Sequence, residues 1–286
     1  MMEKMSLTVV LVAMGWSLLG LNAATVIGAD AEEPRLLAAA TLDAAMTQAA
    51  AEADAGRQLT ILKTAAITAC RQTPANFLIA EMFQKLDQTP GADSRKLAAQ
   101  WQKSVAEARD ILRFEPLSES PLPEGFPKTT PVGELRVQNY PSYRMAKTEM
   151  TFIEGRAFWT LFNHIKGREI AMTAPVEMTY DAGQAPKKTS MAFMYRSTQQ
   201  GTTGKDGSVE IIDIPAQLAV SIGVRGDATK ERVSSVKQRL DAWLQANAAQ
   251  YEAIGPLRLM AYNSPFVADA KKFTEVQIPV RAKVAN

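Results

Sequence analysis

Hydrophobic positions change their spacing twice along this chain of 286 residues. Residues 7–29 are almost continuously apolar, residues 32–114 repeat apolar positions at helical spacing, and residues 133–280 alternate apolar and polar positions in short segments. Spacings of three and four residues are typical of amphipathic helices, whereas alternation is typical of half-buried strands. The pattern therefore predicts an apolar N-terminal segment, an all-α region and an α+β region.

The all-α region is rich in alanine and other good helix formers. Gly56 is expected to end a first helix, and Thr73 with Pro74 to begin another. A last helix over residues 93–113 presents one apolar face, made of Leu97, Trp101, Val105, Ala108 and Leu112. The region carries no catalytic pattern, and we predict a small helical bundle or spacer.

Proline marks the boundary between the two folded regions. Residues 116–131 contain five prolines, and proline removes backbone donors and disfavours helix in the residue before it. An extended linker or strap is expected there. The predicted organisation is a signal peptide or membrane anchor at 1–29, an Ala-rich helical region at 30–115, the linker at 116–131 and a further domain at 132–286.

Within the α+β region, two amphipathic helices are predicted, over residues 156–166 and 230–245. Gly167 follows the first helix directly, and residues 201–207 are expected to form a flexible turn. Strands are predicted within residues 133–150, 170–180, 190–197, 209–224, 257–262 and 273–280.

A weak internal repeat relates the two halves of this region. Residues 134–141 (ELRVQNYP) align with residues 208–215 (SVEIIDIP), and each segment is followed by a strand and a helix. Beyond the helices, residues 171–176 (AMTAPV) match residues 261–266 (AYNSPF). Two strand–strand–helix–strand units predict a pseudo-twofold α+β fold, with one helix per half packed on a curved antiparallel sheet.

Composition restricts the available chemistry. The chain has one cysteine, Cys70, and one histidine, His164. This excludes an intrachain disulfide, a cysteine-based metal site within one chain, His-rich metal sites and every catalytic triad that does not use His164. The net charge is only +2 and no basic stripe is present, so nucleic acid is not expected as a partner.

Residues 1–29 have the residue order of a secretory signal. Lys4 is followed by an apolar stretch and by small residues, before acidic residues begin. Cleavage is expected near Ala24 or Ala29. Without cleavage, residues 7–29 are long enough to span a bilayer as one helix. Both alternatives predict an exported protein, either periplasmic or extracellular, or anchored to the membrane.

Four short segments after the linker form a specific pattern. They are Val137–Arg144 (VQNYPSYR), Ile170–Val176 (IAMTAPV), Arg258–Pro265 (RLMAYNSP) and Lys271–Val276 (KKFTEV). In this order, over residues 131–280, the chain resembles the SOUL haem-binding family. The resemblance implies a distorted antiparallel β-barrel flanked by two helices, and non-covalent binding of haem or related tetrapyrroles without an established catalytic reaction.

The first helix of this region offers the apolar surface that a porphyrin needs. The resemblance implies that Phe158 and Phe162 match cleft-facing positions of the family, although the same side chains also suit packing of the helix on the sheet. Trp159 lies beside this stripe and is the better candidate for exposed aromatic surface.

The iron and the two propionates of haem need further groups. His164 is the candidate metal ligand, yet its position on the helix is more often solvated surface. Met172 is a candidate thioether ligand, or core filling. Arg156, Lys271 and Lys272 are candidate propionate partners, and each is equally a common surface charge.

The sequence therefore favours non-enzymatic binding of haem or a related tetrapyrrole by an exported carrier, scavenger or buffer. A tetrapyrrole-modifying enzyme and a ligand-free interaction module of the cell envelope are the alternatives. No catalytic residue is predicted, because the enzymatic alternative needs an acid, base or redox centre that the sequence does not group together.

Overall fold

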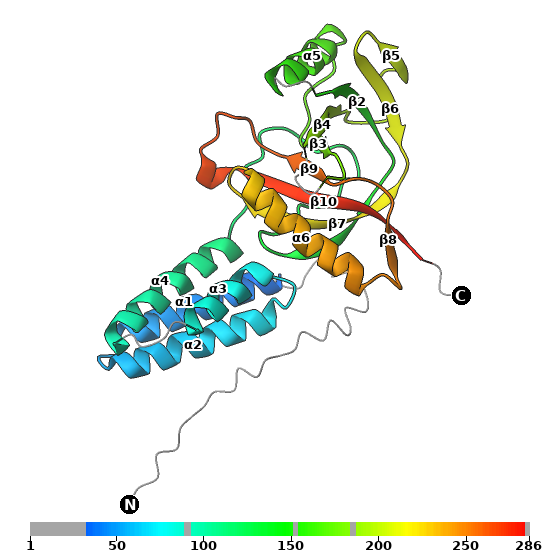
Figure 1. Cartoon of the computed structure of the whole chain (residues 1–286). Helices are drawn as coiled ribbons and strands as arrows, with labels where there is room; N and C mark the ends of the chain where they lie inside the picture. The colour runs from blue at the N-terminus through cyan, green and yellow to red at the C-terminus, as the bar shows by residue number, and fades with distance from the viewer. Residues whose placement is uncertain (1–32, 89–92, 151–153, 184–186, 284–286) are drawn as a thin grey trace, which may run out of the picture. The chain divides into compact units, whose positions relative to one another are not determined.

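The computed structural model describes residues 33–88, 93–150, 154–183 and 187–283. The predicted signal or anchor segment, residues 1–29, lies outside these ranges. No helix within them is long and apolar enough to cross a membrane. Among the described residues, four helices are followed by an antiparallel sheet and two further α-helices (Figure 1).

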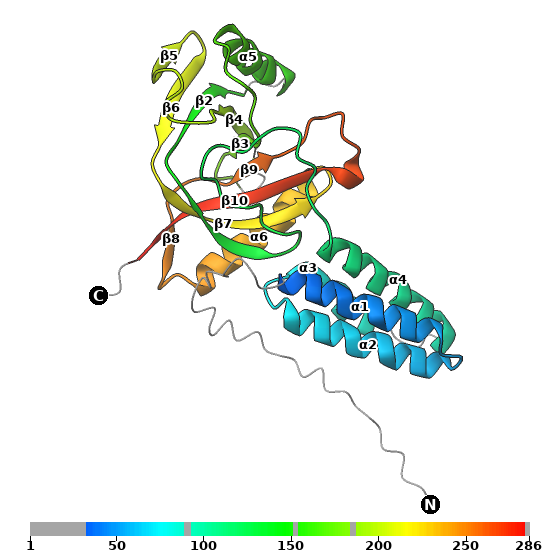
Figure 2. The same ribbon diagram turned by 180° about the vertical axis from the view of Figure 1, so that it is seen from behind.

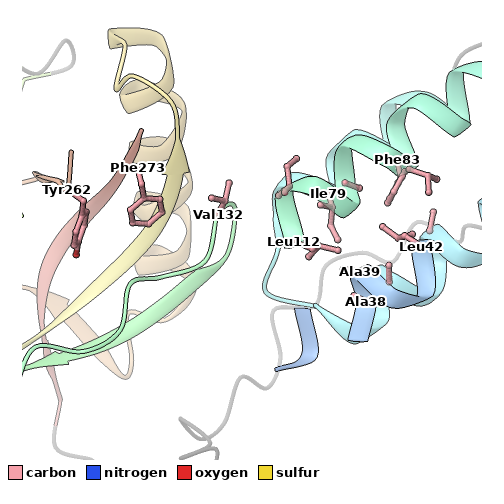
Figure 3. Close-up of a cluster of buried hydrophobic side chains, with 14 of the residues drawn as sticks. Ala38, Ala39, Leu42, Ile79, Phe83, Leu112, Val132, Tyr262 and Phe273 are labelled. Atoms are coloured by element: carbon pink, nitrogen blue, oxygen red, sulfur yellow. The ribbon is translucent and has the colours of Figure 1, made fainter. Parts of the chain in front are cut away.

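The all-α region contains α1 (Pro34–Ala50), α2 (Ala55–Gln72), α3 (Phe77–Asp87) and α4 (Ser94–Leu112). Alanines make up much of its core. Ala38 and Ala39 of α1 are fully buried, together with the larger Leu42, where α1 packs against α2 and α4. Ile79 and Phe83 supply larger buried groups from α3 (Figure 3). The predicted α-helical character of this region is confirmed.

Two helix boundaries differ from the sequence prediction. Gly56 does not end a helix, because it lies in the first turn of α2, where the Asp54 side chain caps the helix by accepting from the Arg57 backbone N–H at 2.8 Å. Thr73 is the C-cap of α2 and does not begin a helix. The Asn76 side chain caps α3 instead.

Ten strands form one antiparallel sheet in the order β1-β7-β10-β9-β3-β4-β2-β6-β5, with β8 paired to β10. Strands β1 and β5 stand at opposite ends of this order, so the expected barrel is not closed. The strands are β1 (Leu135–Tyr140), β2 (Tyr143–Glu149), β3 (Val176–Tyr180), β4 (Lys188–Met194), β5 (Gly204–Asp206), β6 (Val209–Ile214), β7 (Gln217–Arg225), β8 (Tyr251–Ala253), β9 (Arg258–Ala261) and β10 (Phe273–Ala282).

The strand order has the predicted pseudo-twofold symmetry. Exchanging β1 with β6, β2 with β7, β3 with β9 and β4 with β10 reverses the order of these strands and leaves their neighbours unchanged. The α+β class and the internal repeat are therefore confirmed, and the repeat of residues 134–141 and 208–215 falls on β1 and β6.

The second repeat pair was aligned wrongly. Residues 171–176 lead into β3, whereas residues 261–266 follow β9, and residues 170–175 form no strand. Pro175 before β3 corresponds to Pro256 before β9. Met178 and Leu259 have the same separation in sequence as these two prolines, and they are direct partners across β3 and β9. The pseudo-twofold axis therefore passes between them.

The two remaining helices pack on different halves of the sheet. Helix α5 (Glu154–Gly167) contacts β2, β4 and β6, whereas α6 (Lys230–Ala246) contacts β7, β8 and β10 (Figure 2). Alternation along β7 places Val220 and Ile222 in the apolar core beneath the helices and Ser221 on the opposite face.

The proline-rich segment covers that opposite face. Residues 116–131 form no helix or strand, as predicted. Phe126 lies edge-on to Tyr140 and Tyr143, with ring centroids 5.1 and 5.2 Å apart. A Cβ atom at Gly223 of β7 would overlap the Thr130 carbonyl oxygen, so a glycine is required where the linker crosses this strand. The linker is thus a strap packed on the sheet.

Candidate functional site

Helix α5 presents an aromatic surface because its apolar residues occupy more than one helical face. Leu161 and Ile165 are buried against the sheet, and Phe158 and Phe162 are half-buried. Trp159 is 59% exposed, in agreement with the sequence expectation that it lies beside the packing stripe. We call Phe158, Trp159 and Phe162 the α5 aromatic surface.

The three rings of the α5 aromatic surface pack against one another. Phe158 and Phe162 are stacked, with centroids 6.1 Å apart and planes inclined by 12°. Trp159 stands edge-on to both rings, at 5.8 and 5.5 Å. Phe158 also packs edge-on against the buried Phe193 of β4 at 5.2 Å. The two phenylalanines therefore anchor the helix and at the same time form a rigid base for the tryptophan.

His164 is not at the surface, and this expectation was wrong. Its residue exposure is only 6%. Nδ1 lies 2.7 Å from the Asp206 carboxylate of β5, and Nε2 lies 2.8 Å from the Tyr195 hydroxyl. An ionised carboxylate only accepts, so in the neutral imidazole Nδ1 donates to Asp206 and Nε2 accepts from Tyr195. Neither nitrogen is left for a metal.

The other predicted site residues are only partly brought together. Arg156 is exposed in the first turns of α5, and Met172 is half-buried in the segment before β3. Lys271 is exposed, and the Lys272 ammonium pairs with the Asp227 carboxylate at 2.7 Å. Both lysines precede β10, on the half of the sheet that α5 does not contact.

A second group of polar side chains lies buried beneath the linker. Strand alternation explains its position, because β10 sends Val276 and Ile278 into the core beneath the helices and Glu275 and Gln277 to the opposite face. We call this group the polar cluster. Its members are Tyr140, Tyr143, Glu177, Arg258, Tyr262, Glu275 and Gln277.

Arg258 connects most of the polar cluster. Its Nη1 donates to the Tyr143 hydroxyl at 2.9 Å and to the Glu177 carboxylate at 3.3 Å. Its Nε donates to the Gln277 side-chain carbonyl at 3.1 Å. Nη2 is buried and has no hydrogen-bond partner among the described residues. The guanidinium is paired, but not fully satisfied.

Glu275 ties the linker to the polar cluster. Its carboxylate accepts from the Thr130 backbone N–H at 2.5 Å, from the Tyr262 hydroxyl at 2.5 Å and from the Gln277 amide at 3.0 Å. Burial raises the pKa of Glu275, and the hydrogen bonds from Tyr262 and Thr130 oppose this shift only in part. The contact with Thr130 makes the linker part of the sheet's buried network.

A metal ion and a tetrapyrrole need different side chains around them. No group of three or more His, Cys, Asp or Glu side chains that could hold a metal ion occurs in the part of the chain that the structure describes. The α5 aromatic surface suits the flat apolar face of a porphyrin. The described residues thus offer an exposed aromatic surface on α5, whereas both ring nitrogens of His164 are engaged, so that His164 does not fit as an iron ligand.

Comparison with known families agrees with the four sequence segments. The profile of the SOUL heme-binding protein family matches residues 128–279, just over half of the chain. The chain belongs to this family. SOUL membership implies binding of haem or a related tetrapyrrole, and it confirms the family resemblance seen in the sequence. The comparison with curated proteins finds no match.

This SOUL protein also has distant similarity to solved structures. The C-terminal domain of EcmrR is 17% identical, with a TM-score of 0.40, over 52% of this chain and 97% of that domain. A hydrolase from Listeria innocua is 10% identical, with a TM-score of 0.40, over 53% of this chain and 94% of that one. At such low similarity we infer nothing about function from either structure.

Proposed function

We propose that this protein binds haem or a related tetrapyrrole non-covalently, as an exported carrier, scavenger or buffer rather than as an enzyme. The observation that carries the proposal is the exposed indole of Trp159, held by the stacked rings of Phe158 and Phe162 in a chain of the SOUL family. The N-terminal signal-like segment supports export.

Stacking on the α5 aromatic surface would supply most of the affinity. Aromatic side chains bury large areas, and burial of apolar surface contributes roughly 25 cal/mol per Å². The rings are already packed against each other, so little conformational entropy is lost when a flat ligand lies on them. This favours recognition of the macrocycle over recognition of its metal.

Cations at both ends of the same helical face suit the propionates. Arg156 lies three residues before Trp159, and Lys166 lies seven residues after it, so all three share one side of α5. Both cations are exposed and form no ion pair with the described residues. We therefore assign the propionate role to Arg156 and Lys166 in preference to Lys271 and Lys272.

Iron coordination is secondary in this proposal. His164 is engaged by Asp206 and Tyr195, and Met172 remains the candidate axial ligand. Haemin and metal-free protoporphyrin are therefore expected to bind with similar affinity.

Parallel titrations of the full chain with haemin and metal-free protoporphyrin test this function. We expect saturable binding of both, followed by porphyrin absorbance and tryptophan quenching. Trp159→Ala should weaken both by about tenfold or more, because it removes the exposed ring from the stack. Gln238→Ala on α6, at an exposed position, is the surface control and should change neither. Absence of saturable binding by the unmodified chain would overturn the proposal.

A further inference from the structure

A cavity of about 410 Å³ lies under the linker, and no residue of α5 lines it. Its walls come from the start of α1, from residues 114–132 in and beside the linker, and from the sheet and its edges. The last group comprises Arg136 of β1, Ala174 before β3, Tyr262 after β9 and Phe273 of β10. Known small-molecule pockets range over about 300–1,000 Å³. The volume suits a small or single-chain ligand.

Part of the cavity wall is both apolar and exposed. Leu36 of α1 is 37% exposed and Leu117 of the linker is 47% exposed, and both line the cavity. Phe114, Tyr262 and Phe273 line it with aromatic rings. An apolar ligand in the cavity would remove the exposed surface of both leucines from water.

The cations around the cavity are not equivalent. Arg35 is paired with Glu33 at 2.6 Å and also with Glu115. Arg136 is paired with Glu134 at 2.5 Å.

Lys128 is different, because it is exposed and forms no hydrogen bond or ion pair through its side chain with the described residues. Its charge interacts with that of the Glu33 carboxylate without forming an ion pair, so Lys128 is the least engaged cation of the cavity wall. Such a charge attracts an anionic group that is attached to an apolar body.

We infer that this cavity binds a small amphiphilic anion with one apolar chain and a single carboxylate head. The chain would cover Leu36 and Leu117, and the carboxylate would lie at Lys128. The site is separate from the α5 aromatic surface and does not depend on tetrapyrrole binding.

Calorimetric titration with decanoate and with decanol tests this inference, because the two molecules share a chain length and differ in charge. We expect one decanoate per chain. Lys128→Gln should weaken decanoate binding about threefold and leave decanol unchanged, since an exposed ion pair contributes little. Leu117→Ser should weaken both ligands about tenfold, because it removes apolar contact area.

Trp159→Ala alters the α5 aromatic surface, which does not line the cavity, and should leave decanoate binding unchanged. Lys128, Leu117 and Trp159 are all exposed, and circular dichroism would verify that each variant folds. The inference fails if decanoate does not bind at millimolar concentration. It also fails if Lys128→Gln and Leu117→Ser bind decanoate like the unmodified chain, or if Trp159→Ala abolishes binding.

Discussion

The Nε2 atom of His164 lies 2.8 Å from the hydroxyl oxygen of Tyr195, so the single imidazole of the chain joins α5 to the end of β4. On its other side, Nδ1 reaches Asp206 in β5. Asp206 also pairs with Arg168, just after α5, at 2.7 Å. This arrangement holds the helix that carries the aromatic surface against the sheet.

Replacing His164 should therefore affect stability more than ligand binding. We expect His164→Ala to lose about 1–3 kcal/mol of unfolding free energy, because a buried and a partly buried hydrogen bond disappear and the Tyr195 hydroxyl loses its partner. Urea denaturation measures the loss. The Soret band of the haemin complex should keep its position.

Asn163→Ala is the matched control, since Asn163 is the exposed neighbour of His164 on α5. It should change the unfolding free energy by less than about 0.5 kcal/mol. A folded His164→Ala protein with a shifted or lost Soret band would identify His164 as an iron ligand and contradict the structural assignment.

Helix α5 packs on the sheet through Leu161 and offers its exposed aromatic surface through Trp159, so substitutions of these two residues should have different effects on stability. Leu161 is completely buried, and Leu161→Ala should cost about 2–5 kcal/mol of unfolding free energy through the cavity it leaves. Trp159→Ala should cost less than about 1 kcal/mol, because most of the indole is exposed. Denaturant titration of both variants checks this order. Equal losses would mean that Trp159 is a core residue rather than a binding surface.

Arg258 and Glu177 form an ion pair in which both side chains are less than 10% exposed. Arg258→Gln should cost about 3–5 kcal/mol of unfolding free energy, because Glu177 is left buried without its cation. The Glu177→Gln/Arg258→Gln double variant should cost less than the sum of the two single variants. Simple additivity in a double-mutant cycle would show that the two groups do not interact.

The polar cluster should also affect how the stability of the folded protein changes at alkaline pH. Burial raises the pKa of Tyr143 from the ordinary value of 10 to about 12, with Glu177 adding to the shift and Arg258 opposing it. A raised folded-state pKa stabilises the protein below the unfolded value and loses this contribution as the pH rises through the folded value. The stability that Tyr143 contributes should therefore fall between pH 10 and pH 12.

Comparison with Tyr143→Phe measures this effect. The variant should be less stable than the unmodified chain at pH 8 by about 1 kcal/mol, the contribution of a hydrogen bond. The difference should shrink as the pH approaches 12. A difference that stays constant over this range would show that Tyr143 ionises equally in the folded and unfolded states.

Much of the fold could be predicted because local patterns determined it. Helical spacing located α4, α5 and α6, and the paired segments at 134–141 and 208–215 indicated the pseudo-twofold symmetry. The breaks around Gly56 and Thr73 were misplaced, because capping side chains rather than glycine or proline decide those helix ends. Strand closure depends on long-range pairing, which no local pattern encodes.

The site was harder to predict, because its polar contacts join distant segments. Exposure of Trp159 follows from its place on the helix, but burial of His164 depends on Asp206, which lies 42 residues away. Glu275 and Gln277 alternate with apolar residues in the last strand, and this was the available signal for the polar cluster. Their partner Arg258 becomes visible only once β9 pairs with β10.

The indole N–H signals of the tryptophans in a two-dimensional NMR spectrum test tetrapyrrole binding at α5 most directly. Diamagnetic zinc protoporphyrin is added to the full chain, and buried Trp101 and Trp243 serve as internal references. The ring current of the macrocycle should shift the Trp159 signal strongly and leave those two in place. Saturable porphyrin binding with an unmoved Trp159 signal would contradict the account and place the ligand elsewhere.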